Sequence, residues 1–598
     1  MRKSMSNVVR LLLLFAVSVL GFSQSPVPPA SSNPAQATQN ADLSDPSTVL
    51  KVKTRLVVVD VVAQTGKGQP VTDLKAEDFT LTEDDKPQQI RSFSLQQSSA
   101  GSSAARPQIP PLPANMVTNL PQYQTSGPWN VLLLDALNTN LSNQAYMREQ
   151  MIKFLEKLPS GAPIAVYLLG SKLRLVQDFT SDPDTLKQAI RSLKLQGSVV
   201  LSNPSGMTPE TDLPPGSIAN ALLASVPGLR GQILAFQEEH TAAQTDFQVR
   251  YTLRALNSLG RTLAGYPGRK NLIWISEAFP FDILSVRNHN NRDYSNDVAA
   301  TGSMLSDAQV AIYPVDARGL VNYSAYSAGS DPNPLAGGAV ANTTLNGAMG
   351  QEMNAEANVL MAAHTSMSDL ADKTGGKAFW GHNNLDGEVQ QSLTDGSTYY
   401  TLAYYPDNKD WNGDFRKIHL KVNRAGLKLR YRLGYFADDR TAFTKETQAQ
   451  QDEAFNLALS LDWPIATALR FTAQVLPPSA QTQNKVVVRY RIDPRGLNFE
   501  QGSDGFQHVA VLCAVRAYSI KNSDKIVAAE ANNLSGPLRP EAYSRVVNAG
   551  FLPCQEQIEL LAGDYFLRVG VRDNSTGLIG TATARVTVPA TTAATGKP

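Results

Sequence analysis

The segment Trp129-Asn130-Val131-Leu132-Leu133-Leu134-Asp135 decides how the rest of the chain is interpreted. Its uninterrupted apolar run is typical of a strand buried on both faces of a parallel sheet. Helical and apolar strand patterns alternate after it. The predicted elements are a helix over 142–158, a strand over 164–169, helices over 182–193 and 251–263, strands over 271–275 and 309–315, and a closing helix over 361–374. This alternation predicts a doubly wound, Rossmann-like α/β domain over residues 129–394.

Two groups of short strand patterns flank this domain. The first runs from the β-branched stretch at Val52 to residue 97, and the second covers 397–405, 415–422 and 428–435. Neither group has enough strands to bury an apolar face alone. We therefore expect residues 49–97 and 395–438 to be two halves of one β-sandwich, with the α/β domain inserted between them and residues 98–128 as a linker.

The C-terminal part of the chain reads as a separate β module. After a helical linker over 439–465, residues 466–589 show only strand patterns separated by Gly and Asn turns, which predicts an immunoglobulin-like β-sandwich. This module contains both cysteines of the chain, Cys513 and Cys554. In an oxidising compartment they could form one disulfide, and two separate buried thiols are the alternative. Residues 590–598 are expected to be a disordered tail.

The N-terminus has the features of an export signal. Basic residues flank the apolar run Leu11 to Leu20, which ends in Gly21-Phe22-Ser23 and is too short to span a bilayer comfortably. We expect residues 1–23 to be a signal peptide cleaved after Ser23, with a retained signal anchor as the alternative. Residues 24–48 predict a disordered tether. The mature chain is therefore expected in the periplasm or outside the cell, without a further membrane span.

Composition and motifs argue against several classes of function. The chain has 54 Lys plus Arg against 53 Asp plus Glu, without a basic cluster, so a nucleic-acid partner is not expected. Gly-x-Ser-x-Gly, His-Glu-x-x-His and phosphate-loop motifs are absent from the sequence, and its histidines lack ligand spacing. We predict that the protein is not an enzyme. The alternative is a secreted hydrolase of cell-envelope or polymeric substrates that uses the strand-end carboxylates Asp135, Glu277 and Asp316.

The segment Leu134-Asp135-Ala136-Leu137-Asn138-Thr139-Asn140 resembles the first metal-binding loop, Asp-x-Ser-x-Ser, of von Willebrand factor A domains. Residues 268–276 and 311–316 resemble the central strand of that family and the strand after it. Together with Asp78-Phe79 and Leu433-Gly434-Tyr435-Phe436, they make the chain similar to the von Willebrand A-related proteins of acidobacteria over most of 52–436. The resemblance implies binding of a protein or cell-surface macromolecule, in a protein–protein or adhesion-type interaction.

The chain departs from the family pattern at its metal site. Leu137 stands in place of the first hydroxyl, Thr139 matches the second, and Glu277 aligns with the second carboxylate. The resemblance implies a degenerate site for Mg²⁺ or another divalent cation made by Asp135, Thr139 and Glu277, and a partner-binding surface that also includes Asn138.

The residues alone leave simpler interpretations open. Asp135 could cap a helix or accept loop hydrogen bonds, Glu277 could lie in solvent, and Asn138 could form a turn. Three long stretches fit no regular element and are expected to contact a partner or to be disordered. They are residues 197–244, 282–296 and 324–353.

Overall fold

A computed structural model gives the structure of the chain. It describes residues 56–97, 112–120, 128–157, 163–194, 229–277, 294–318, 363–381, 384–438, 447–479 and 484–589, with the single residues 357, 360, 361 and 482. The predicted signal peptide, tether, tail and 324–353 stretch lie outside the described residues. Within the described ranges, no helix is long and apolar enough to cross a membrane.

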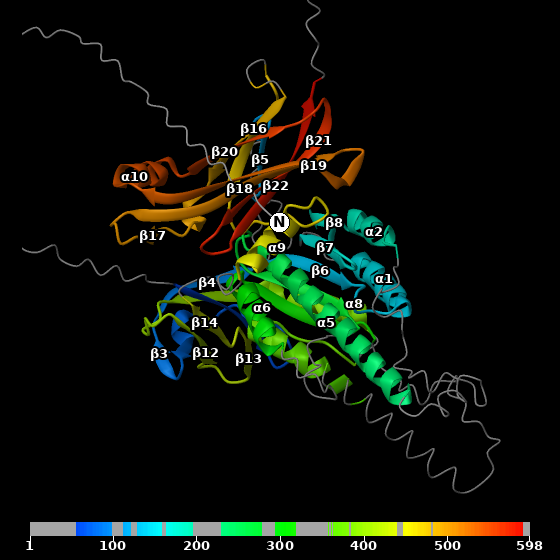
Figure 1. Cartoon of the computed structure of the whole chain (residues 1–598). Helices are drawn as coiled ribbons and strands as arrows, with labels where there is room; N and C mark the ends of the chain where they lie inside the picture. Colours follow the sequence, from blue (N-terminus) through cyan, green and yellow to red (C-terminus); the bar gives the residue numbers. More distant parts are fainter. Residues whose placement is uncertain are drawn as a thin grey trace, which may run out of the picture. The chain divides into compact units, whose positions relative to one another are not determined.

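A five-stranded sheet forms the centre of the α/β domain (Figure 1). Its strands are β6 (Trp129–Asp135), β7 (Ile164–Leu169), β8 (Leu173–Thr180), β9 (Lys270–Ser276) and β10 (Val310–Asp316), in the order β10-β9-β6-β7-β8. β6 lies in the middle, parallel to both neighbours. The edge strand β8 is antiparallel to β7 and was not predicted. The chain is therefore a mixed α/β protein.

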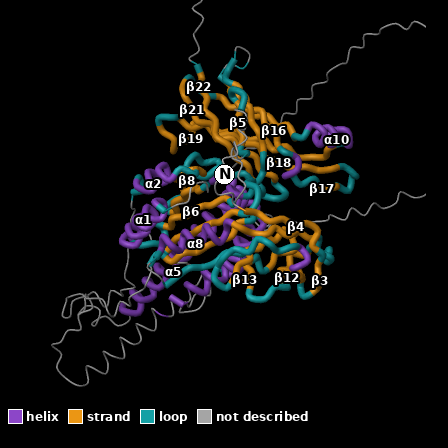
Figure 2. Tube along the Cα trace, turned by 180° about the vertical axis from the view of Figure 1, so that it is seen from behind, coloured by secondary structure: helices purple, strands orange, loops and turns teal. Residues whose placement is uncertain are grey.

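Helices cover both faces of this sheet, which Figures 1 and 2 show from opposite sides. They are α1 (Leu141–Glu156), α2 (Pro183–Arg191), α5 (Leu229–Leu263), α6 (Ser295–Asp307) and α8 (Leu385–Ser397). Alternate residues of β6 enter different cores, since successive strand side chains point to opposite faces. Val131 and Leu133 pack with α5 residues, and Leu132 and Leu134 pack with α1 residues. β6 is thus covered on both faces.

The expectation of an irregular stretch over 197–244 is wrong from residue 229 onward. There α5 begins, 35 residues long, well before the predicted helix start at Tyr251. The sequence of its first part shows no clear amphipathic repeat, so it did not predict a helix there. The predicted irregular stretch over 282–296 likewise overlaps the first residues of α6, while residues 282–293 lie outside the described ranges.

Strands before and after the α/β domain form two further sheets. Their members are β1 (Val57–Thr65), β2 (Phe79–Glu83), β3 (Lys86–Gln88), β4 (Ile90–Gln97), β11 (Thr398–Tyr404), β12 (Asn412–Val422), β13 (Leu427–Arg430) and β14 (Gly434–Asp438). The sheets run β13-β1-β11-β4 and β14-β12-β2-β3. Each mixes strands from both sides of the α/β domain, and their inward side chains share one core that includes Val59, Leu81, Leu402 and Leu420.

Two more sheets make up the C-terminal module, which follows α9 (Gln448–Ala458). One runs β20-β16-β15-β5 and the other β17-β18-β21-β22, with β19 paired to β18. The bounds are β5 (Met116–Thr118), β15 (Phe471–Leu476), β16 (Lys485–Ile492), β17 (Glu500–Gln501), β18 (Gln507–Ser519), β19 (Asn522–Leu538), β20 (Leu552–Glu559), β21 (Gly563–Asp573) and β22 (Ile579–Val588). Alternating side chains from both sheets build a common core.

Two sequence expectations need correction in this module. The predicted linker 98–128 contributes β5, whose residues pair with Thr472 to Gln474 of β15. The module is also not all strands, because Pro540 begins a helix, α10 (Pro540–Ala549), that ends at Gly550 with φ of 70°. A proline at the first helical position and a glycine just past the end are ordinary helix boundaries.

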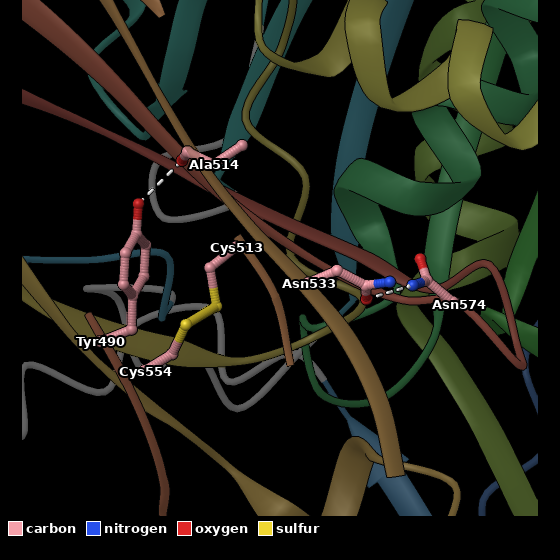
Figure 3. Close-up of a disulfide and its surroundings, with 6 residues drawn as sticks. All are labelled: Tyr490, Cys513, Ala514, Asn533, Cys554 and Asn574. Atoms are coloured by element: carbon pink, nitrogen blue, oxygen red, sulfur yellow. Dashed lines mark hydrogen bonds between the residues drawn. A yellow bond between two sulfur atoms is a disulfide. The ribbon is translucent and has the colours of Figure 1, made fainter. Parts of the chain in front are cut away.

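A disulfide between Cys513 of β18 and Cys554 of β20 joins the two sheets of the C-terminal module (Figure 3). The Cα atoms of the two residues lie 6.9 Å apart, and the residues are 41 positions apart in sequence. Beside it, Tyr490 donates from its hydroxyl to the carbonyl oxygen of Ala514 at 2.7 Å, again from one sheet to the other. The two sheets are therefore held together by covalent and polar contacts as well as by their apolar core.

Candidate functional site

The carboxyl ends of three parallel strands meet at one rim of the α/β sheet. Asp135 ends β6, Ser276 ends β9 and Asp316 ends β10. The parallel register sets Asp316 beside Ser276 and Leu134 beside Ile275. Ligand sites in open α/β sheets form at this edge, so the rim is the candidate site.

Asp135 is completely buried, and its carboxylate accepts four hydrogen bonds. The backbone N–H of Asn138 donates to one oxygen at 3.0 Å. The side-chain amide of Asn138 (2.8 Å), the indole N–H of Trp274 (3.0 Å) and the hydroxyl of Ser276 (2.9 Å) donate to the other. Burial raises the pKa of Asp135, and these donors oppose the rise because they favour the charged form. The carboxylate is thus fully partnered inside the protein.

Asn138 and Leu137 fix the loop after β6. Asn138 is completely buried, and its amide also donates to the hydroxyl of Thr252 on α5 at 2.9 Å. Leu137 is buried in the same apolar cluster as Val131 and Leu133. The residue that replaces the family's first hydroxyl therefore extends the core, and the loop is tied to α5.

Thr139 and Glu277 contact each other and the start of α1. The hydroxyl of Thr139, completely buried, accepts from the backbone N–H of Glu277 at 3.1 Å. The half-buried Glu277 carboxylate accepts from the backbone N–H (2.7 Å) and side-chain amide (3.0 Å) of Asn140. Asn140 caps α1 by accepting from the N–H of Asn143. The helix cap is therefore Asn140, and Asp135 is the loop acceptor.

A divalent cation does not fit the residues found here. Leu137 offers no oxygen, and three N–H groups aimed at Asp135 occupy the directions in which a cation would have to approach. Hard cations need several converging oxygen ligands. Among the described residues, no group of three or more His, Cys, Asp or Glu side chains is placed to hold a metal ion.

Next to this network lies a second group of polar residues, around Asp316, that the sequence did not predict to lie together. Asp316, 2% exposed, accepts from the guanidinium of Arg318 at 2.7 to 3.2 Å and faces Nε2 of His364 at 3.2 Å. Burial opposes ionisation of Asp316, but hydrogen bonds from His364 and Arg318 outweigh it and lower the pKa of Asp316. The His364 ring stacks on Trp380 at a centroid distance of 4.9 Å. The sequence signal that could have indicated this group is Arg318, two positions after the strand-end Asp316.

The exposed part of the rim lies at the start of α1. Leu141, the first residue of that helix, is 51% exposed, and it follows the half-buried Asn140 that holds Glu277. An exposed leucine at a rim of polar residues that already have partners favours contact with another macromolecule over chemistry on a small substrate.

No family model matches this chain, and no curated protein matches it. Among solved structures, it is similar to an aerotolerance-related membrane protein from Bacteroides fragilis (11% identity, 45% of this chain and 98% of that one, TM-score 0.24). It is also similar to a von Willebrand factor type A protein from Catenulispora acidiphila (10%, 64% and 80%, TM-score 0.25).

A third similar structure is proximal thread matrix protein 1 from the mussel byssus, with a zinc-occupied MIDAS motif. The identity is 10%, the match covers 47% of this chain and 48% of that one, and the TM-score is 0.21. All of these values are low, so the likenesses carry no inference about binding or catalysis.

Proposed function

We propose that this chain is an exported, modular binding protein. Its α/β domain is a von Willebrand factor A-like domain that contacts a protein or cell-surface macromolecule in a protein–protein or adhesion-type interaction. The observation that carries the proposal is the rim itself, where hydrogen bonds to the Asp135 carboxylate hold the loop after β6 and Leu141 is exposed. The predicted export signal favours a periplasmic or extracellular location, and the C-terminal module, if it is an immunoglobulin-like sandwich as the sequence predicts, fits a surface protein.

The interaction proposed here is independent of a divalent cation. Asp135, the predicted first ligand, is engaged by four donors, and Thr139 and Glu277 are engaged by each other and by Asn140. Hydrogen bonds within the protein thus do the structural work that a bound cation does in an intact site of this type. Chelation is expected to leave binding unchanged.

The function is proposed to be non-catalytic, and the hydrolase alternative has less support. A general acid or base must come within hydrogen-bond reach of its substrate. Asp135 is completely buried, Asp316 is bonded to Arg318, and Glu277 is held by Asn140. Hydrolysis of a cell-envelope polymer that Asp135→Asn abolishes, in a variant that still folds, would instead establish the alternative.

The test uses the mature chain as bait in an envelope extract, with EDTA and with Mg²⁺. Leu141→Asp places a charge on the proposed contact, and aspartate in the first turn of α1 suits the helix dipole, so the fold is kept. Leu561→Asp is the matched control, since Leu561 is 76% exposed in the C-terminal module. We expect equal recovery of the same partner with and without chelator, and a loss of about tenfold or more in Leu141→Asp alone.

Two results would overturn the proposal. Recovery that disappears with EDTA would mean that the interaction needs a cation after all. Recovery that Leu141→Asp leaves intact would mean that the contact surface is elsewhere.

A further inference from the structure

A buried glutamate interrupts the apolar row of β20. Residues of this strand alternate between buried and exposed, and the buried positions are Leu552, Cys554, Glu556 and Ile558. Glu556 is only 7% exposed and faces the interior between the two sheets, as its apolar neighbours do. A carboxylate in such a row is costly to bury unless a partner compensates its charge.

The structure supplies incomplete compensation for this carboxylate. Oxygen Oε1 of Glu556 is buried and has no hydrogen-bond partner among the described residues. The backbone of Glu556 is already used in the antiparallel ladder opposite Val488. Since native buried polar groups nearly always have partners, an unpartnered carboxylate oxygen points to a ligand that the protein chain does not provide.

A second carboxylate approaches from the edge of the other sheet. Glu530 lies on β19, opposite Val515 of β18, and its side chain is exposed. Burial, and after it the charge of Glu530, raises the pKa of Glu556 to about 7. Two neighbouring carboxylates resist ionising together unless a cation lies between them.

The disulfide fixes the strands that carry this pair. Cys554 is two residues before Glu556 on the same face of β20, and Cys513 is two residues before Val515 on β18. The disulfide therefore ties β20 to β18, the strand that pairs with β19. Glu556 lies two residues from Cys554, and Val515, the residue opposite Glu530, lies two residues from Cys513.

We propose that Glu530 and Glu556 form a cation site at the edge between β19 and β20, and that its ligand is a divalent cation of the calcium type. Hard cations take carboxylate oxygens, and the remaining ligands are waters that enter past the exposed Glu530. With two protein carboxylates, the expected dissociation constant is about 1 mM, as in the weaker calcium sites of extracellular modules. This site is separate from the rim of the α/β domain.

The test is thermal unfolding of the full mature chain at pH 8, with CaCl₂ against NaCl at equal ionic strength. At 10 mM CaCl₂ we expect the melting temperature of the C-terminal module to rise by about 5 °C. Glu556→Gln should remove this rise, and Glu530→Gln should reduce it by at least half. Glu559→Gln is the matched control, because Glu559 is an exposed glutamate on the same strand, and it should respond like the native chain.

A second readout separates a lost site from a lost fold. Glu530 is exposed, so Glu530→Gln does not disturb the core, and calorimetric titration of that variant should show Ca²⁺ binding at least fivefold weaker. At pH 5.5 protons compete with the cation, and the rise for the native chain should shrink. The proposal fails if Ca²⁺, Mg²⁺ and Mn²⁺ give no more stabilisation than NaCl, or if Glu556→Gln keeps the full response. Neither result would bear on the rim of the α/β domain.

Discussion

Two buried carboxylates, Asp135 and Glu556, lie in opposite chemical situations. Asp135 is completely buried and accepts four hydrogen bonds, while Glu556 is 7% exposed and one of its oxygens has no described partner. Burial raises the pKa of both groups. The difference lies in what faces them, which is a set of donors at the rim and a second carboxylate in the C-terminal module. Burial of a carboxylate alone therefore does not indicate a ligand site. The hydrogen-bond partners of its oxygens have to be counted as well.

The position of each carboxylate along its strand explains this difference. Asp135 ends β6, where the chain turns and the backbone N–H of Asn138 is free to donate to it. Glu556 lies within β20, where backbone groups pair with β16. The backbone N–H groups around a carboxylate in the middle of a strand are used in the ladder, so its hydrogen-bond partners must come from side chains or from a ligand. An unpartnered carboxylate is therefore a stronger sign of a ligand in the middle of a strand than at its end.

The largest expected effect comes from removing the covalent link beside Glu556. The double variant Cys513→Ser with Cys554→Ser should lower the free energy of unfolding of the C-terminal module by about 4 kcal/mol, because the bond closes a loop of 41 residues. Chemical denaturation measures this loss. Reducing the native protein with dithiothreitol should have the same effect, and an unchanged transition after reduction would mean two separate thiols.

At the rim, truncating Asp135 should have a somewhat smaller effect. Asp135→Ala removes the carboxylate that accepts from the buried N–H groups of Asn138 and Trp274, which we expect to cost about 3 kcal/mol. Chemical denaturation followed by circular dichroism measures the change. Asp182→Ala is the control, because Asp182 is an exposed cap of α2 whose loss should cost only about 1 kcal/mol. Equal losses in the two variants would contradict the importance of the network.

Local patterns in the sequence predicted the central elements of the fold, and pairing decided the rest. The apolar run Val131 to Leu134 carries its own signal, since a strand covered on both faces must be apolar throughout. β5 has three residues and exists only through its pairing with β15, far along the chain. β19 is rich in Ala and Asn and mostly exposed, so its sequence shows no alternation of apolar and polar residues that would predict a strand.

The candidate site shows the same division. Asp135 could be picked out because it ends a predicted strand, and the family resemblance implied Asn138, Thr139 and Glu277. The structure places them in two sets of hydrogen bonds, one around Asp135 and Asn138 and one around Thr139 and Glu277. The donors Trp274 and Ser276 come from the neighbouring strand, and only the β6–β9 register places them beside Asp135. The isobutyl group of Leu137 was read as a missing ligand, and its burial shows that it is a core residue.

The pH dependence of stability tests whether Glu556, in contrast to Asp135, is buried without enough hydrogen-bond partners. Its pKa in the folded state, about 7, lies above its ordinary value of about 4.3, so its contribution to stability is fully present below about pH 4.3 and is lost as the pH rises through 7. Without added cation, the C-terminal module should lose about 3 kcal/mol between pH 4.5 and pH 8 through this group. Glu556→Gln should flatten that part of the profile, and Glu559→Gln should not.

The smallest effect should come from removing one donor of four. Ser276→Ala leaves Asp135 bonded to Asn138 and Trp274, so we expect a loss of about 1 kcal/mol, well below that of Asp135→Ala. The same denaturation experiment measures it, and Ser142→Ala, at the exposed start of α1, is the matched hydroxyl control. A loss as large as that of Asp135→Ala would mean that the four bonds act as one cooperative unit. In that case a ligand could not take over any of the four hydrogen-bond donors, because each bond would be needed to keep the buried carboxylate of Asp135 in place.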